Sequence, residues 1–289
     1  MTPEAESHPE RGASQTALGA AGLRAAHLLL DNPPPIFEDQ VALRLLDPGA
    51  EHAILDHSER FRTQGSRSIR CDVLARSRYA EDRLEEAVRR GVGQYVILGA
   101  GLDTFAHRQP AWAHDLQIVE VDHPASQADK LERLKRAGIE QPANLRYGAA
   151  DLEADALVPV LEAAGLDRAR PAFIACLGVL IYLSEGAADS IFAMAAAFTA
   201  GSELVFTFSR PDASTGRQPL PGSAAALMAS LGEPWRTRFE PPLLANKLKA
   251  ADFRSSSFLF AEDVTKRYLA GRTDDLRAPW RAVIADATV

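Results

Sequence analysis

Few features of this sequence point to a secreted, metal-binding or membrane-spanning protein. Its 289 residues include two cysteines, Cys71 and Cys176, which stand far apart and outside any cysteine or histidine cluster with zinc-ligand spacing. That scarcity argues against a disulfide framework and a structural zinc site, and it predicts a reducing, cytoplasmic location. The longest early apolar stretch, residues 17–30, is interrupted by Arg24 and His27. It is too short to span a bilayer, so we interpret it as an amphipathic helix and expect no membrane partner.

An excess of positive charge is also missing. The formal net charge is -7 and the isoelectric point is near 5.6, which gives no global attraction to nucleic acid or to an anionic membrane surface. Hydrophobic residues make up 46% and charged residues 25% of the chain, as in an ordinary globular protein. We therefore expect a large domain with a buried core and no nucleic-acid partner.

Helical patterning dominates the first third of the chain. Residues 1–15 are polar and rich in Glu, Ser, Pro and Gly, which predicts a disordered tail. From 16 to 92, apolar residues recur near helical spacing, with a break at the prolines of 33–35 and a stop at Gly91. A long helical segment is thus expected to precede the first strand.

From residue 93 onward, short apolar runs alternate with helical patterns. The predicted strands are 94–98, 116–121, 144–148, 171–177 and 203–208. A further helix is predicted near 222–231, and the chain then ends with a strand, a helix and a strand. This alternation predicts an α/β fold with a mostly parallel sheet and helices on both of its faces.

The first predicted strand runs into a turn with two glycines, in the sequence GAG. Gly99 and Gly101 would let the backbone bend tightly and approach a ligand closely, because a Cβ at either position would intrude. The same pattern also occurs in an ordinary strand-to-helix turn. The glycines alone therefore leave both interpretations open.

Two acidic residues follow at the ends of the next two predicted strands. Asp122 lies 21 residues after Gly101, a separation at which a carboxylate can accept both hydroxyls of a bound ribose. Asp151 follows the third strand, where an acid could accept from an adenine amino group. Each aspartate could instead cap the helix after it. Together, a glycine turn and two acids at successive strand ends match the parts of an adenosine.

The residues of the turn favour one adenosine cofactor over another. A dinucleotide site needs a third glycine and a helix start free of negative charge for the pyrophosphate. Here Thr104 replaces that glycine, and Asp103 would repel the phosphates. S-adenosylmethionine carries a sulfonium and no phosphate, so carboxylates beside the turn suit it. An NAD-dependent oxidoreductase remains the less favoured alternative.

At this point the sequence resembles a known family. The stretches RSRYAEDRL (76–84), VILGAGLDTFAHR (96–108), VEVDHPASQADK (119–130), AADL (149–152) and GVLIYLSEGA (178–187) are similar to those of the leucine carboxyl methyltransferase superfamily. Within it, the bacterial S-adenosylmethionine-dependent methyltransferases, some acting on polyketides, look nearest. The resemblance covers nearly the whole chain from about residue 17.

The resemblance implies a class I methyltransferase fold, which is a Rossmann-like sheet of seven strands with the last one antiparallel. It implies a single domain over 16–289, in which the helices of 16–92 form a lid and 93–289 form the core. Residues 209–250 would be an insertion on the acceptor side. The expected reaction is O-methylation of a small-molecule carboxylate or hydroxyl, with S-adenosylmethionine as the cofactor.

The resemblance also assigns roles to individual residues. Gly99, Ala100 and Gly101 would lie along the methionine part of the cofactor, with Asp103 beside them. Asp122 would hold the ribose, and Asp151 with Leu152 the adenine. Arg78 would bind the cofactor carboxylate and Arg24 would be a second basic contact, since a desolvated carboxylate needs a charged partner. Either arginine could instead lie on a solvated helix face, an alternative that is about equally favoured for Arg24.

One position departs from the family pattern. Leu177, five residues before Tyr182 and beside Cys176, stands where relatives carry an acidic residue that contacts the cofactor or helps to shape the transfer site. The chain could therefore have kept the fold as a binding or regulatory module that no longer catalyses methyl transfer.

Candidates for the chemistry itself are few. Tyr182 follows the predicted fourth strand, where acceptors usually bind in such folds, although a tyrosine there could simply pack its ring. His107 and His123 are more typical of loop or capping residues than of a catalytic base. An apolar set in 209–250 could line an acceptor pocket or belong to the core: Met228, Trp235, Phe239, Pro241 and Pro242.

Overall fold

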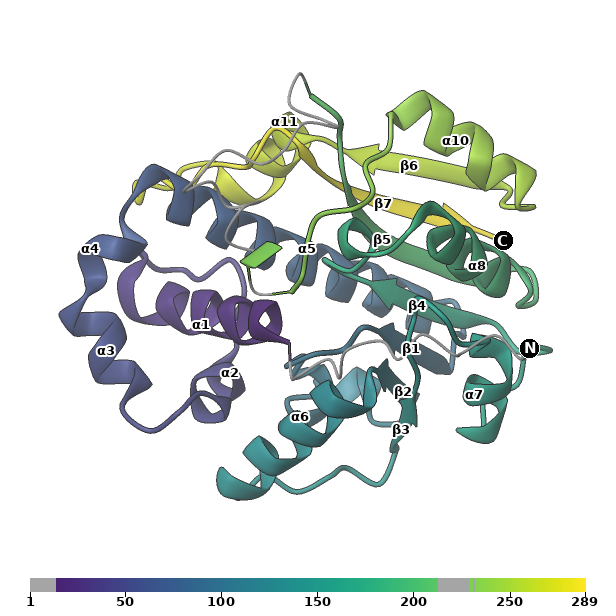
Figure 1. The fold of residues 1–289 in the computed structure, drawn as a ribbon, viewed down its shortest axis with the longest axis horizontal. Coiled ribbons are helices and arrows are strands. Elements are labelled where there is room, and N and C mark those ends of the chain that lie inside the picture. Colours follow the sequence, from purple (N-terminus) through teal and green to yellow (C-terminus); the bar gives the residue numbers. More distant parts are fainter. Residues whose placement is uncertain (1–13, 213–228, 231) are drawn as a thin grey trace, which may run out of the picture.

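A single seven-stranded sheet organises the protein (Figure 1). The structure is a computed structural model that describes residues 14–212, 229–230 and 232–289. The strand order is β3-β2-β1-β4-β5-β7-β6. The last strand, β7, runs antiparallel to both of its neighbours, β5 and β6, which confirms the expected α/β fold with an antiparallel last strand. The strands are β1 (Gln94–Leu98), β2 (Gln117–Asp122), β3 (Leu145–Ala149), β4 (Ala172–Cys176), β5 (Glu203–Ser209), β6 (Ser255–Leu259) and β7 (Ala282–Thr288).

The central strands are buried on both faces, which explains their continuous apolar sequences. All five residues of β1 and all five of β4 are buried. Successive side chains of a strand point to opposite faces, so Val96 and Leu98 join one core cluster while Tyr95 and Ile97 join the other. The predicted strands agree with the observed ones to within one residue at each end.

Helices cover both faces, as the alternating pattern predicts. One face packs against α7 (Leu157–Ala163), α8 (Glu185–Ala196) and α10 (Pro241–Ala250). The other packs against α5 (Gln64–Arg89), α11 (Ala261–Val264) and the helical turn η4 (Thr265–Leu269). Helix α6 (Pro124–Arg136) follows β2, and three short helical turns lie in the loops: η1 (Phe105–His107), η2 (Ala111–Ala113) and η3 (Leu180–Tyr182).

The first four helices gather at one side of the sheet (Figure 1). They are α1 (Gln15–Leu30), α2 (Gln40–Leu45), α3 (Ala50–Asp56) and α4 (Ser58–Phe61). Ser14 is the N-cap of α1, and its side chain accepts a hydrogen bond from the Ala17 N–H. The buried alanines of α1 share a small apolar cluster with Leu102, which lies just after the glycine turn. These helices therefore stand over the carboxyl ends of the parallel strands.

Some expectations fall on residues that the structure does not describe. Most of the predicted tail, residues 1–15, lies outside the described ranges, while Ser14 caps α1 and Gln15 is its first residue. The predicted helix at 222–231 also lies largely outside them, with residues 229–230 described as helical. Across the described ranges, no helix combines the length and the apolar character needed to cross a bilayer.

Candidate functional site

The glycine turn after β1 needs glycine at both positions. Gly99 has φ 62° and Gly101 has φ 48°, values in the left-handed region that residues with a side chain rarely adopt. A Cβ on Gly99 would overlap a methyl group of Val179, and a Cβ on Gly101 would lie 2.9 Å from the Ala17 Cβ. The turn is thus enclosed by the segment after β4 on one side and by α1 on the other.

Asp122 is joined directly to this turn. One carboxylate oxygen accepts a hydrogen bond from the Gly101 N–H, and the other accepts from the His123 N–H at 2.6 Å. The N-cap of α6 is His123, so helix capping does not account for Asp122. Burial raises the pKa of the Asp122 carboxyl above its usual value, while the two backbone N–H groups oppose that rise.

Asp151 and Leu152 lie in the loop after β3, the strand next to β2. An Asp151 carboxylate oxygen accepts from the Glu153 N–H at 3.0 Å. Helix α7 has Ala156 as its N-cap, so Asp151 does not cap that helix. Leu152 is half-buried against the cluster that includes α7 and α8. Because β1, β2 and β3 are adjacent and parallel, the glycine turn, Asp122 and Asp151 share one sheet edge.

Ala100 and Asp103 shape the turn itself. Ala100 is buried between the two glycines and donates its N–H to the Val121 carbonyl at 3.2 Å. The Asp103 carboxylate accepts from the Phe105 N–H at 2.8 Å, where η1 begins. Asp103 therefore holds the exit of the turn, and its negative charge stays beside the site.

Arg24 lies at the centre of the contact between the first helices and the turn. Its side chain is buried, with Nε donating to the Asp39 carboxylate at 2.7 Å and Nη2 donating to the Leu102 carbonyl at 2.6 Å. The Thr104 hydroxyl donates to the same carboxylate at 2.7 Å. Arg24 is thus neither on a solvated face nor unpaired, and it ties α1 to the end of the glycine turn.

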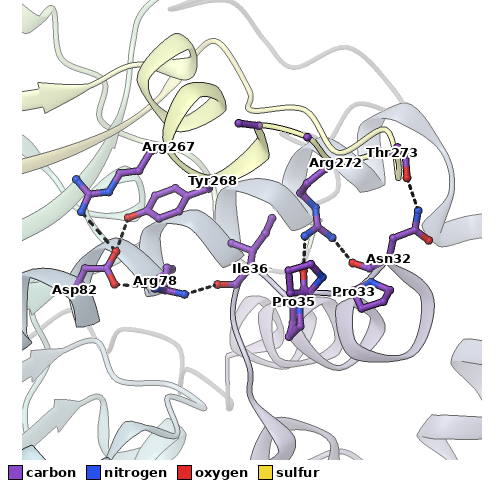
Figure 2. Close-up of a pocket in the computed structure, with 13 residues that line it drawn as sticks. Asn32, Pro33, Pro35, Ile36, Arg78, Asp82, Arg267, Tyr268, Arg272 and Thr273 are labelled. Atoms are coloured by element: carbon purple, nitrogen blue, oxygen red, sulfur yellow. Dashed lines mark hydrogen bonds and ion pairs between the residues drawn. The ribbon is translucent and has the colours of Figure 1, made fainter.

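The structure does not bring Arg78 to the glycine turn. Its Nε donates to Asp82 at 2.7 Å, and its side chain lines a surface pocket of about 460 Å³ (Figure 2). Arg267 and the Tyr268 hydroxyl contact the same Asp82 carboxylate, at 3.5 and 3.0 Å. The rest of the lining comes from 32–36 and 270–273, so no residue of the turn contributes.

Arg76, which sequence reasoning missed, lies where a basic residue was expected. A Cβ on Gly178, the second residue after β4, would be 2.5 Å from Nη2 of Arg76. The guanidinium also pairs with Asp72 at 3.1 Å. Residues 76 and 78 stand on opposite sides of a helix, since each residue turns by about 100°. Helical spacing does not separate the two arginines, because Arg76 is spaced from the buried Val73 and Ala80 much as Arg78 is from other buried residues of α5.

The residues at the end of β4 are apolar. Cys176 is fully buried, and burial raises the pKa of its thiol to about 12. Leu177 is half-buried and packs against the cluster that includes α5. The position that departs from the family pattern is therefore filled by an aliphatic side chain at the sheet edge, one residue before the glycine that the Arg76 guanidinium approaches.

Tyr182 ends η3 close to this same arginine. Burial raises the pKa of its phenol, and the nearby Arg76 opposes that rise, so the hydroxyl is protonated at neutral pH. Thr16 of α1 donates its N–H to the Glu233 carboxylate at 3.1 Å, which brings the 233–237 segment against α1. That segment also contacts η3, because the Arg236 N–H donates to the Ile181 carbonyl at 2.7 Å.

The other candidates that the structure describes lie at loop, helix-start or core positions. Burial lowers the pKa of His107 to about 4, and Nδ1 lies 3.3 Å from the Glu140 carbonyl oxygen. His123 caps α6. Phe239 is buried in the core, Pro241 and Pro242 begin α10, and Met228 lies outside the described residues. Trp235 is half-buried, and its side chain lies against the Tyr182 hydroxyl.

Comparison with known proteins agrees with this geometry. The model of the leucine carboxyl methyltransferase family matches residues 17–196. A Bacillus subtilis (strain 168) protein named "Putative S-adenosyl-L-methionine-dependent methyltransferase YktD" is 29% identical, over 92% of this chain and 94% of the relative. A Mycobacterium avium (strain 104) protein named "Putative S-adenosyl-L-methionine-dependent methyltransferase" is 34% identical, over 66% of this chain and 62% of the relative.

The fold also recurs among solved structures. A crystal structure titled as a "putative methyltransferase" from Thermobifida fusca YX superimposes with a TM-score of 0.57. The alignment covers 92% of this chain and 93% of that one, at 20% sequence identity. At this level of identity the likeness concerns the fold, and it extends over both the first helices and the sheet.

Proposed function

The chain belongs to the leucine carboxyl methyltransferase family of S-adenosylmethionine-dependent methyltransferases, and from this premise we propose that it methylates an oxygen atom of a small metabolite. The acceptor would be a carboxylate or a hydroxyl group. The observation that carries the proposal is the hydrogen bond from the Gly101 N–H to the Asp122 carboxylate. It places an acidic side chain against a turn in which a Cβ at either glycine would clash with its neighbours.

The residues present fit the proposed cofactor. Gly99, Ala100 and Gly101 would run along its methionine part, and Asp122 would accept the ribose hydroxyls. Asp151 and Leu152 would contact the adenine. We assign the cofactor carboxylate to Arg76, because its guanidinium reaches the edge of β4 beside the turn, whereas Arg78 is engaged in a separate pocket. Arg24 would act through α1, by holding that helix on the turn.

Catalysis in this site would rest mainly on positioning. S-adenosylmethionine, when bound, supplies a methyl group on a positively charged sulfur, which an acceptor oxygen attacks in line. A carboxylate acceptor needs no base, so the site has only to align it and exclude water. The protonated Tyr182 hydroxyl is suited to donate a hydrogen bond that orients the acceptor. A hydroxyl acceptor would lose its proton on methylation, to solvent or to a base.

Calorimetry tests the proposal directly. We expect the native protein to bind S-adenosylmethionine and not NAD, and we expect Asp122→Ala to weaken binding at least about tenfold, since a charged hydrogen bond contributes about 1.5–3 kcal/mol. Asp189→Ala is the control, because Asp189 forms an exposed ion pair with Lys247 on α10. Tight NAD binding without a response to S-adenosylmethionine would reject the proposal.

A binding module without catalysis is the second candidate, and Leu177 is the observation that favours it. Incubation with methyl-labelled donor and a panel of carboxylic and phenolic metabolites distinguishes the two. Transfer to any acceptor, lost in Asp122→Ala, would eliminate the module. Cofactor binding without transfer to any member of the panel, including after Leu177→Glu, would favour it.

A further inference from the structure

The surface pocket beside Arg78 lies between α5, η4 and the segment that joins α1 to α2 (Figure 2). Its volume of about 460 Å³ falls within the range of pockets that bind small molecules, about 300–1,000 Å³. The described residues that line it include none of the glycine turn and not Arg76. A ligand in this pocket would therefore be a different molecule from the proposed cofactor.

Positive charge exceeds negative charge in the lining. Among the described residues that line the pocket, three are arginines, Arg78, Arg267 and Arg272, and one is an acid, Asp82. Arg272 is already neutralised, because its guanidinium pairs with Asp274 and both side chains are at most 10% exposed. Arg78 and Arg267 share the single carboxylate of Asp82. The pocket thus carries one unit of positive charge in excess, on a chain whose net charge is -7.

Both arginines that share Asp82 keep donors for a ligand. Arg78 donates from Nε to Asp82 at 2.7 Å and from Nη1 to the Ile36 carbonyl at 3.3 Å, while Nη2 donates to no group of the described residues. Arg267 approaches Asp82 at 3.5 Å without a hydrogen bond to the described residues, and its guanidinium lies over the Tyr268 ring. The two side chains are 48% and 43% exposed, so a ligand can reach them.

Asp82 holds the arginines in place and is not available to a cationic ligand. One of its oxygens accepts from Arg78, and the other accepts from the Tyr268 hydroxyl at 3.0 Å. Burial raises the pKa of Tyr268, so this hydroxyl stays protonated and continues to donate. The remaining guanidinium donors favour an anion, and their planar arrangement matches a carboxylate. A single excess charge suits a monoanion better than a doubly charged phosphate, which Asp82 would repel.

The walls of the pocket are joined without a ligand. Arg272 donates from Nη2 to the Asn32 carbonyl at 2.6 Å, and the Asn32 side chain donates to the Thr273 hydroxyl at 2.9 Å. These bonds hold 32–36 against 270–273 (Figure 2). Little ordering is therefore needed when a ligand binds, which favours affinity for a small molecule. The prolines and Ile36 of this wall offer it an apolar surface.

We propose that this pocket is a second binding site, for a small organic carboxylate with an apolar body. Arg78 and Arg267 bind the carboxylate group, and the wall of residues 33–36 contacts the apolar body. The inference does not rest on the proposed methyl transfer, because it concerns a different set of residues and a different ligand.

Benzoate is the probe for this site, and benzamide, which has a similar shape without the charge, is its control. We expect the native protein to bind benzoate at least about tenfold more tightly than benzamide in an NMR titration, with amide shifts at Ile36 and 270–273. Arg78→Met and Arg267→Met should each weaken benzoate binding at least about tenfold. Arg168→Met is the matched control and should bind like the native protein, because Arg168 is also 43% exposed but pairs with Glu162 outside the pocket.

The outcomes separate this inference from the proposed function. Absence of benzoate binding, equal binding of benzamide, or unchanged affinity in a folded Arg78→Met or Arg267→Met variant overturns it. Thermal unfolding identifies a variant that does not fold, and the other variant then decides. Tighter binding of inorganic phosphate than of benzoate overturns the choice of a carboxylate. Saturating S-adenosylmethionine should leave benzoate affinity unchanged, and displacement of benzoate would assign the pocket to the cofactor and overturn the second site. A protein that binds benzoate here but not S-adenosylmethionine would contradict the proposed function alone.

Discussion

At the scale of single residues, Arg76 and Arg78 form a natural pair of matched substitutions. They are two positions apart on α5, yet one reaches the end of β4 and the other lines the separate surface pocket. We expect Arg76→Ala to weaken S-adenosylmethionine binding about tenfold or more, through loss of a charge-assisted hydrogen bond. Arg78→Ala should bind like the native protein. Titration calorimetry compares them, and the reverse ranking would return the carboxylate contact to Arg78.

Gly99 and Gly138 separate two reasons for requiring glycine. Both have φ 62°, but a Cβ on Gly138 would meet no atom within 4 Å, whereas one on Gly99 would overlap Val179. Gly138→Ala should cost about 1–2 kcal/mol from backbone strain alone. Gly99→Ala should cost about 1–3 kcal/mol more from overpacking. Urea unfolding measures both. Val179→Ala in the Gly99→Ala background should recover part of the loss, and equal costs for the two single variants would contradict the packing argument.

The contrast between Asp122 and Arg76 shows how far the sequence predicts a site. Asp122 ends β2, and its spacing from Gly101 spans the single connection from β1 to the adjacent parallel strand, so its position follows from chain geometry. Arg76 belongs to a long helix, where rotation by a fraction of a turn decides which of two arginines faces the sheet. That rotation depends on how α5 packs on the core, which local patterning does not specify.

At the scale of secondary-structure elements, the strands were the easier prediction. A strand buried on both faces, such as β1 or β4, has an unbroken apolar sequence bounded by polar turns. The short helices α3 and α4 bury little surface: Ile54 of α3 is buried, and α4 has no buried residue. Their sequences therefore show no periodic pattern of apolar residues from which their ends could be predicted. The contact of α1 with the glycine turn depends on tertiary packing and had no counterpart in the sequence pattern.

The junction between the first helices and the core depends on one buried carboxylate. Asp39 caps α2 by accepting from the Ala42 N–H at 2.9 Å, and it binds Arg24 and Thr104. Burial would raise its pKa, but the two arginines nearby, Arg24 and Arg108, hold the pKa below its usual value. Asp39→Ala leaves both cations without this partner.

We expect Asp39→Ala to destabilise the protein by about 3–5 kcal/mol in urea unfolding, the range for breaking a buried ion pair. Asp189→Ala, which removes an exposed pair, should change stability by no more than about 1 kcal/mol. Because the Asp39 pKa is lowered, its stabilisation should be present at neutral pH and be lost as the pH falls through that lowered value. A similar small cost for both variants would show that Asp39 does not anchor the junction.

At the scale of the whole molecule, α1 stands over the place where the cofactor is proposed to bind. Ala17 packs onto Gly101, and Thr16 contacts Glu233, which lies 217 residues later in the sequence. A ligand along the glycine turn would therefore displace α1 or be covered by it. In either case the rate of amide hydrogen exchange in α1 should change when the cofactor binds, while the rate in the buried strands should not.

Hydrogen exchange with and without S-adenosylmethionine measures this response. We expect the amides of α1 and of residues 233–237 to gain protection on binding, because the bound cofactor adds contacts under both segments. The amides of β4 serve as an internal control, since that strand is fully buried and should exchange slowly in both states. In Asp122→Ala the gain should disappear at the same cofactor concentration. Protection gained around Arg78 and 270–273 instead would place the ligand in the pocket of Figure 2. It would also show that the helices over the sheet edge cover the core without responding to the cofactor.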